Sequence, residues 1–159
     1  MIKKPQPKDT TSQWLNFAHQ ETLTSEQVDF FKQYCALLLS WNKTINLTTI
    51  ANESDVIEYH FRDSLQAKQI VDMSLIAHCA DVGSGGGFPG IPLAIKYPHL
   101  RVTLIEVSAK KIQFLDTVIT ELNLGDRISI FDQDWRTFLR MTKRSEEHTS
   151  ELQSQNRIS

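Results

Sequence analysis

The chain has 159 residues, of which 40% are hydrophobic and 23% are charged, and its formal net charge is −2. This composition is typical of one folded domain and excludes a wholly disordered chain. A polyanion would have to bind a local basic patch, because the nearly neutral bulk charge would not attract it.

The cysteines and the first residues indicate a cytoplasmic protein. Cys35 and Cys79 are far apart, and we interpret both as reduced thiols. The start, MIKKPQPKDTTSQW, holds lysines without the apolar run of a signal peptide, and no apolar run approaches the length of a membrane span. His60, His78, Cys79 and His99 lack the spacing of metal ligands, so we expect neither a metal nor a membrane partner.

Residues 1–73 are predicted to be helical, because apolar residues recur there at helical spacing. The segment LTSEQVDFFKQYCALLLSWNK has a capping box at Thr24 and Gln27. Its apolar face holds Val28, Phe31, Cys35, Leu38 and Trp41. The later segment VIEYHFRDSLQAKQIV repeats this pattern through Ile57, Phe61, Leu65 and Ile70.

Residues 74–143 are predicted to alternate between strands and helices. The strand segments are LIAHCADVG, RVTLIEV and RISIFDQDW. Between them, FPGIPLAIKY has Pro89 and Pro92 in a first helical turn, and SAKKIQFLDTVITELNLG places Gly125 just after a helix. Short strands alternating with helices predict an α/β fold with a parallel sheet and right-handed crossovers.

The segment ADVGSGGGFPGIPLAI holds five of the six glycines of the chain. A loop between a strand and a helix places unpaired N–H groups and a positive dipole end at the carboxyl edge of the sheet. A tight turn without a ligand does not need so many glycines. The loop is not a phosphate-binding P-loop, because Ile91 and Pro92 stand where that motif has Lys and Ser or Thr.

The acidic residues after the predicted strands favour S-adenosylmethionine over NAD. Asp81, followed by Gly83, Gly85 and Gly87, would attract an ammonium group, directly or through water, and would repel a pyrophosphate. Glu106 ends the second strand, where it would accept the ribose hydroxyls. The segment Asp134-Trp135 would border an adenine.

Two alternatives stay open at this point. Gly85 to Gly90 also matches G-x-G-x-x-G, so an NAD-binding oxidoreductase half-domain is the second interpretation. Taken alone, Asp81 could be a helix-capping acid and Glu106 a solvated loop acid.

The motifs DVGSGGGFPGIPLAI, SWNKTINLT and HFRDS closely resemble the bacterial glucose-inhibited division protein B family, from about Leu37 to Phe138. The resemblance implies a Rossmann-like class I methyltransferase domain with about three strands of an incomplete sheet. It also implies S-adenosyl-L-methionine as cofactor, and modification of guanine N7 in small-subunit (16S) ribosomal RNA. The expected partner is that RNA or the ribosomal subunit, and we expect a monomer.

The resemblance and the loop chemistry together give candidate site residues. The candidates for binding the cofactor are Asp81, Gly83, Gly85, Gly87, Phe88, Glu106, Trp135 and Arg136. The candidates for contacting RNA are Asn42, Lys43, Asn46, His60 and Asp63. Asn46 could instead close a turn and His60 could be a structural histidine, while Arg62 departs from the apolar residue common at its position.

No catalytic acid–base pair is predicted. Guanine N7 carries a free lone pair at neutral pH, so catalysis is expected to consist of holding an accessible base in line with the methyl group. The third alternative, a non-catalytic RNA-binding or ribosome-binding module, would bind RNA without the cofactor.

The last segment, RSEEHTSELQSQNRIS, has no apolar periodicity and resembles a translated sequencing adapter. Our hypothesis is that residues 144–159 are a non-native tail on a truncated chain, the alternative being an ordinary disordered polar tail. We therefore expect this 159-residue chain to bind cofactor poorly and not to methylate RNA.

Overall fold

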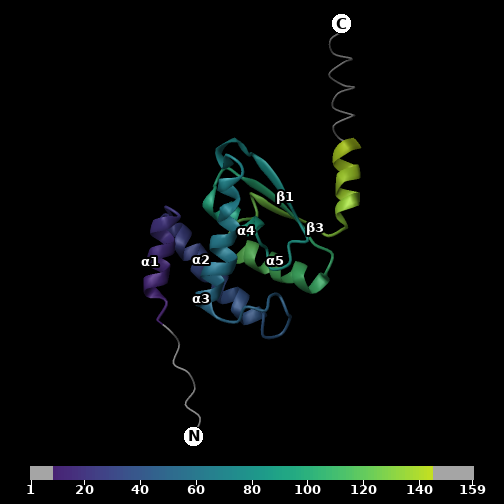
Figure 1. Ribbon diagram of the computed structural model, residues 1–159. Helices are drawn as coiled ribbons and strands as arrows, with labels where there is room; N and C mark the ends of the chain where they lie inside the picture. The colour runs from purple at the N-terminus through teal and green to yellow at the C-terminus, as the bar shows by residue number, and fades with distance from the viewer. Residues whose placement is uncertain (1–8, 145–159) are drawn as a thin grey trace.

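The computed structural model describes residues 9–144 and confirms the α/β class. A parallel sheet has the order β1 (His78–Val82), β2 (Arg101–Ile105) and β3 (Ile128–Phe131). Figure 1 shows this sheet beside the helices that precede it in the chain. The carboxyl ends of the strands are in register, because Val82 pairs with Ile105 and Ile105 pairs with Phe131.

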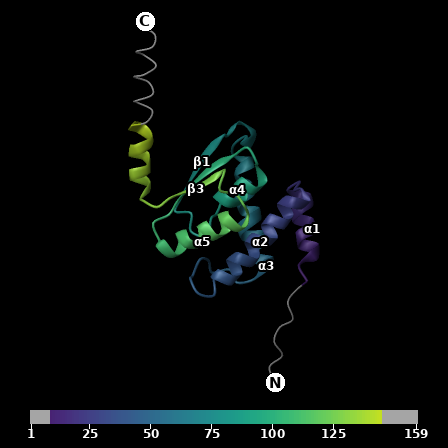
Figure 2. The same ribbon diagram turned by 180° about the vertical axis from the view of Figure 1, so that it is seen from behind.

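The helices pack on the sheet in two layers. Helices α4 (Gly90–Lys96) and α5 (Ala109–Glu121) contact the strands, and α2 (Ser25–Trp41) contacts both of these helices. Seen from behind in Figure 2, α5 lies between the sheet and α2. The apolar core runs without interruption from Trp14 to Ile128, so the helical region and the sheet share it.

Helix α2 begins where the sequence predicts. Helix α2 has the complete capping box, in which the Thr24 side chain accepts from the Gln27 amide and the Gln27 side chain accepts from the Thr24 amide. Phe31 and Leu38, both predicted to be on the apolar face of α2, are buried. Helix α1 (Thr11–Gln20) precedes α2 and buries Trp14.

The prediction of an uninterrupted helical face through Ile70 is wrong. After α3 (Glu53–Asp55), the chain forms a π-helix, η1 (Val56–Arg62), and then two 3-10 helices, η2 (Leu65–Gln69) and η3 (Met73–Leu75). The change from wide turns to tight turns alters which residues share a face. The side chain of Ile70 is consequently 87% exposed, although Ile57, Phe61 and Leu65 are buried.

Two predicted boundaries also move. Strand β1 begins at His78, because Leu75 belongs to η3 and is 79% exposed. Helix α5 ends in a turn where Asn123, with φ 52°, takes a left-handed conformation, so the helix ends before the position of Gly125 that the sequence suggested. The Leu124 amide donates to the Ile119 carbonyl in this turn, which is the hydrogen bond of a Schellman motif.

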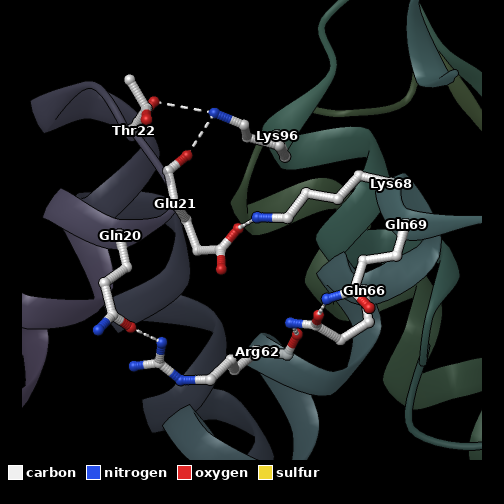
Figure 3. A network of polar contacts seen from close by, with 8 residues as sticks. All are labelled: Gln20, Glu21, Thr22, Arg62, Gln66, Lys68, Gln69 and Lys96. Atoms are coloured by element: carbon white, nitrogen blue, oxygen red, sulfur yellow. Dashed lines mark hydrogen bonds and ion pairs between the residues drawn. The ribbon is translucent and has the colours of Figure 1, made fainter.

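A polar network joins the helical region to α4 (Figure 3). Lys96 at the end of α4 donates to the carbonyl oxygens of Glu21 and Thr22, at 2.5 and 2.8 Å. Lys68 of η2 forms an ion pair of 2.5 Å with the buried Glu21 carboxylate. Arg62, the residue that departs from the family pattern, reaches Gln20 of α1.

A helix over 135–144 follows β3, and both views place it on the opposite side of the molecule from α1. It is joined to β3 by an edge-to-face contact between Phe131 and Phe138, with ring centroids 5.3 Å apart. The predicted boundaries at residues 73, 143 and 144 stay predictions, and the predicted tail lies outside the described residues except for Arg144.

Candidate functional site

The glycine loop connects β1 to α4 at the carboxyl edge of the sheet. Gly83, Gly85 and Gly87 have φ angles of 75°, 57° and 91°, which L side chains rarely adopt. The Gly83 amide donates to the Ile105 carbonyl at 2.8 Å, and the Gly87 amide donates to the Ser84 carbonyl at 2.7 Å. The loop is therefore tied both to the adjacent strand and to itself.

Two of the glycines allow close packing, while a third faces open space. A Cβ atom on Gly90 would lie 2.5 Å from Leu104 Cδ2, and one on Gly87 would lie 2.7 Å from the Tyr34 hydroxyl oxygen. A Cβ atom on Gly83 would meet no atom within 4 Å. A ligand can thus approach the loop backbone at Gly83.

The Glu106 carboxylate binds three backbone amides beside this open space. Its Oε2 accepts from the Gly85 amide at 2.9 Å, and its Oε1 accepts from the Val107 and Ser108 amides, each at 2.9 Å. The side chain is buried, with the residue 7% exposed, so Glu106 is not the solvated loop acid of the alternative interpretation. A carboxylate has about four acceptor positions, which leaves Oε2 able to accept one more hydrogen bond.

Asp81 holds the start of α4. Its Oδ2 accepts from the Gly90 amide at 3.0 Å, and the residue is 9% exposed. Burial raises the pKa of this carboxyl, and the nearby charge of Glu106 adds a smaller contribution in the same direction. In this structure Asp81 therefore makes the helix-capping contact that the sequence left open as an alternative.

Phe88 and His60 connect the glycine loop to the helical region. Their rings stack with centroids 4.3 Å apart, and His60 Nε2 lies 2.7 Å from the Thr48 hydroxyl. Burial lowers the pKa of His60, while the charge of Asp63 opposes this change. His60 is thus a packed histidine whose neutral form is favoured.

A cleft of about 320 Å³ lies between η1, η2 and the loop. Its lining includes His60, Asp63 and Phe88, which the sequence predicted to be site residues, together with Tyr59 and Gln66. The exposed carboxylate of Asp63 is the only acidic group among the residues that line this cleft.

The remaining predicted RNA-contacting residues divide into one structural residue and two exposed residues. The side-chain Oδ1 of Asn42 accepts from the Leu47 and Thr48 backbone amides at 2.8 and 3.0 Å, and its side-chain Nδ2 donates to the Thr48 backbone carbonyl at 2.8 Å. Asn42 therefore closes the turn that the sequence assigned to Asn46. Lys43 and Asn46 are exposed on this turn.

Trp135 and Arg136 begin the helix over 135–144. The Arg136 guanidinium carbon lies 5.2 Å from the centre of the Trp135 ring, and both residues are exposed. Asp134 caps the helix by accepting from the Arg136 amide at 2.9 Å, and hydrogen bonds from Thr137 lower the pKa of Asp134. The predicted adenine-flanking residues therefore follow β3 at the same edge of the sheet as Glu106.

The comparison with protein families decides the assignment. The family model described as GidB, rRNA small subunit methyltransferase G, matches residues 27–145. The chain belongs to this family. The matched range includes every candidate site residue, from Asn42 to Arg136.

Several GidB-family relatives carry the name ribosomal RNA small subunit methyltransferase G. The one from Geobacillus kaustophilus (strain HTA426) is 41% identical over 118 residues, which cover 74% of this chain and 49% of that protein. The one from Staphylococcus aureus (strain bovine RF122 / ET3-1) is 42% identical over 115 residues, covering 72% and 48%. The one from Chromobacterium violaceum (strain ATCC 12472) is 41% identical over 142 residues, covering 82% and 64%. The chain thus spans about half the length of the curated relatives it matches.

The described part of this GidB-family chain has neither a metal-binding cluster nor a membrane-spanning helix. Residues 9–144 contain no cluster of three or more His, Cys, Asp or Glu side chains that could hold a metal ion. No helix over the same range is both long and apolar enough to cross a membrane.

Two residues of the site, Tyr34 and Thr48, were not predicted from the sequence. The Tyr34 hydroxyl donates to the Gly86 carbonyl in the middle of the glycine loop. The signal that could have found it is a hydroxyl on the apolar face of α2, where a buried hydroxyl needs a partner. Thr48 lies in the quoted SWNKTINLT motif, although its contact with His60 gives no local signal.

Proposed function

We propose that this chain carries the cofactor-binding half of an S-adenosylmethionine-dependent methyltransferase that modifies guanine N7 in small-subunit ribosomal RNA. The observation that carries the proposal is the pairing of Glu106 with the Gly85 amide beside the open backbone at Gly83. The GidB-family match and the names of the relatives support the reaction.

The arrangement of these residues fits this cofactor. The remaining acceptor position on Glu106 Oε2 would bind one ribose hydroxyl, one fewer than the sequence suggested. The Asp81 carboxylate would attract the ammonium group of the methionine moiety, directly or through water. Trp135 and Arg136 would flank the adenine at the end of β3.

The proposed methyl transfer needs little acid–base chemistry from protein side chains. The cofactor, when bound, supplies a methyl group on a sulfonium, and guanine N7 supplies the lone pair. The protein has to hold the base at the loop and exclude water, so no general base is required. The cleft between His60, Asp63 and Phe88 is the proposed place for the accessible guanine, because it adjoins the loop.

The RNA backbone would be bound by exposed cations rather than by bulk charge. Lys43 is exposed on the turn after α2, and Arg136, Arg140 and Lys143 are exposed on the helix over 135–144. Such residues contact phosphates without reading the sequence. We propose the ribosomal small subunit or its RNA as the partner, the cytoplasm as the location, and a monomer as the active state.

Cofactor binding is tested first by titrating the chain with S-adenosylhomocysteine and, separately, with NADH in a calorimeter. Weak binding of S-adenosylhomocysteine without binding of NADH is the expected result. The reverse preference would support the oxidoreductase alternative. The Glu121→Gln variant, which changes an exposed carboxylate at the end of α5, is the control for non-specific charge effects.

The reaction is tested by incubating small ribosomal subunits with the protein and a tritiated methyl donor, then locating the label. We expect this 159-residue chain to incorporate no label; any label that does form should lie at guanine N7, and label on a ribose or an exocyclic amine would contradict the proposal. RNA binding without cofactor binding would favour the non-catalytic module. The expectation that this 159-residue chain does not itself methylate RNA stays a prediction of the same assay.

A further inference from the structure

Tyr34 links helix α2 to the glycine loop. Its side chain is fully buried, and its hydroxyl donates a hydrogen bond to the carbonyl oxygen of Gly86, 52 residues later in the chain. Burial and, to a lesser extent, the charge of Asp81 raise the pKa of Tyr34. The phenol consequently stays protonated and remains a donor at neutral pH.

The loop is shaped around this hydroxyl. A Cβ atom on Gly87 would lie 2.7 Å from the Tyr34 oxygen, so the backbone passes directly against it. The Phe88 ring stacks on the Tyr34 ring with centroids 5.4 Å apart. Tyr34 therefore contacts Gly86, Gly87 and Phe88 in succession, which is the half of the loop that leads into α4.

The acceptor of the Tyr34 hydroxyl is a loop residue between two glycines with positive φ angles, Gly85 and Gly87. Glycine residues can adopt many backbone conformations, and holding them in one conformation costs conformational entropy. Contacts from other segments are therefore needed to keep this loop in one conformation. Glu106 holds the Gly85 end, and Tyr34 holds the Gly86–Phe88 end.

We propose that Tyr34 is a positioning residue for the cofactor loop: its hydroxyl fixes the Gly86–Gly87 peptide in the shape that receives the cofactor. The inference rests on the proposed cofactor function and deepens it. It assigns to the helical region a role in cofactor affinity as well as in facing the RNA.

The test compares Tyr34→Phe with Tyr97→Phe in the 159-residue chain. Tyr97 follows α4, and its hydroxyl makes no hydrogen bond among residues 9–144, so it controls for loss of a phenol oxygen. The first readout is hydrogen exchange of the Gly87 and Phe88 amides, which donate to the Ser84 carbonyl. The second is the Kd for S-adenosylhomocysteine.

The expected result is local. Tyr34→Phe should speed exchange of the two loop amides about tenfold while exchange in α5 is unchanged, because only the loop opens. The Kd should rise about tenfold, which corresponds to about 1.4 kcal/mol. Tyr97→Phe should change neither quantity.

Equal loop exchange in Tyr34→Phe and the unsubstituted chain would overturn the proposal, as would faster exchange spread evenly over loop and α5. If the unsubstituted chain binds no cofactor, the proposed function fails, and the exchange experiment still decides whether Tyr34 holds the loop. Should Tyr34→Phe be partly unfolded, trimethylamine oxide is added to restore the folded population before the comparison.

Discussion

The Gly85 amide and the Glu106 carboxylate are joined by a hydrogen bond of 2.9 Å across the carboxyl ends of β1 and β2. Gly85 is in the left-handed conformation, with φ 57°, and this turn orients its N–H group toward the Glu106 carboxylate. Hydrogen bonds from the Val107 and Ser108 amides, just before α5, orient the carboxylate. The conformation of the loop and the orientation of Glu106 therefore depend on each other, and a substitution in either should alter both.

Replacing Glu106 by Gln should lower both stability and cofactor affinity. The amide side chain brings an N–H group toward backbone N–H donors, so at least one charge-assisted hydrogen bond is lost. We expect the free energy of unfolding to fall by about 1–3 kcal/mol in urea denaturation. Glu121→Gln should leave it within about 0.5 kcal/mol. A stability of Glu106→Gln equal to that control would mean that the three amides do not need the carboxylate.

Replacing Asp81 by Asn should separate stability from binding. The raised pKa of Asp81 means that its stabilising contribution is complete below the ordinary pKa of 3.8 and is lost as the pH rises through the raised value. Asn can still accept from the Gly90 amide without a charge. The free energy of unfolding at pH 7 should therefore be unchanged or higher, while the Kd for S-adenosylhomocysteine rises about tenfold. Unfolding curves at pH 5 and 7 and a calorimetric titration measure both, and equal cofactor affinity would refute the role given to the carboxylate.

Replacing Gly90 by Ala should be costly, although Ala is the better helix former. The added methyl group would lie 2.5 Å from Leu104 Cδ2 and 2.9 Å from Asp81 Oδ2. Such overpacking costs about 1–3 kcal/mol of unfolding free energy, or more. Gly125→Ala is the matched control, because its nearest neighbour, Ile119 Cγ2, is 3.9 Å away. Equal melting temperatures for the two variants would show that α4 can move away from β2 at little cost.

The elements that the sequence predicts well are those with local signals. The capping box at Thr24, the strand that begins at Arg101 and the loop from Gly83 to Gly87 each depend on residues that lie within a few positions of one another. A local signal can also give the wrong position for a helix end where two nearby residues can both adopt the left-handed conformation. Asn123 and Gly125 both tolerate positive φ, and the turn uses the first of them.

The rest depends on contacts between distant segments, which no local pattern records. One exception is local: the break in the helical face before Ile70 accompanies a hydrogen bond of 2.5 Å from the Ser64 hydroxyl to the His60 carbonyl four residues earlier, which the spacing of apolar residues does not reveal. The partner of Tyr34 is 52 residues away. The family resemblance identified Asn42 and His60 as important without showing that one closes a turn and the other stacks on Phe88.

Gln27 should contribute more to the free energy of unfolding than an ordinary capping residue does. Its side-chain oxygen accepts from the Thr24 amide, and its nitrogen donates to the Ile95 and Lys96 carbonyls at the end of α4, each at 2.9 Å. Gln27→Ala should therefore lower the free energy of unfolding by about 1–2 kcal/mol. Gln33→Ala, on an exposed position of the same helix, should change it by about 0.5 kcal/mol or less. Urea denaturation of both variants makes the comparison, and similar losses would assign no role to the contact with α4.

His60 should make stability fall in mild acid. Because burial lowers its pKa in the folded state, its stabilising contribution is complete above the ordinary value of 6.5 and is lost as the pH falls through the lowered value. Protonation would place a charge against the Phe88 ring and require the Thr48 hydroxyl to act as acceptor. His60→Gln should flatten the pH dependence of the free energy of unfolding between pH 8 and 5, while His19→Gln, on an exposed position of α1, serves as the matched control. If His60→Gln and the unsubstituted chain lose stability in parallel over this range, another group carries the acid sensitivity, and the contact between the loop and the helical region does not depend on the charge of His60.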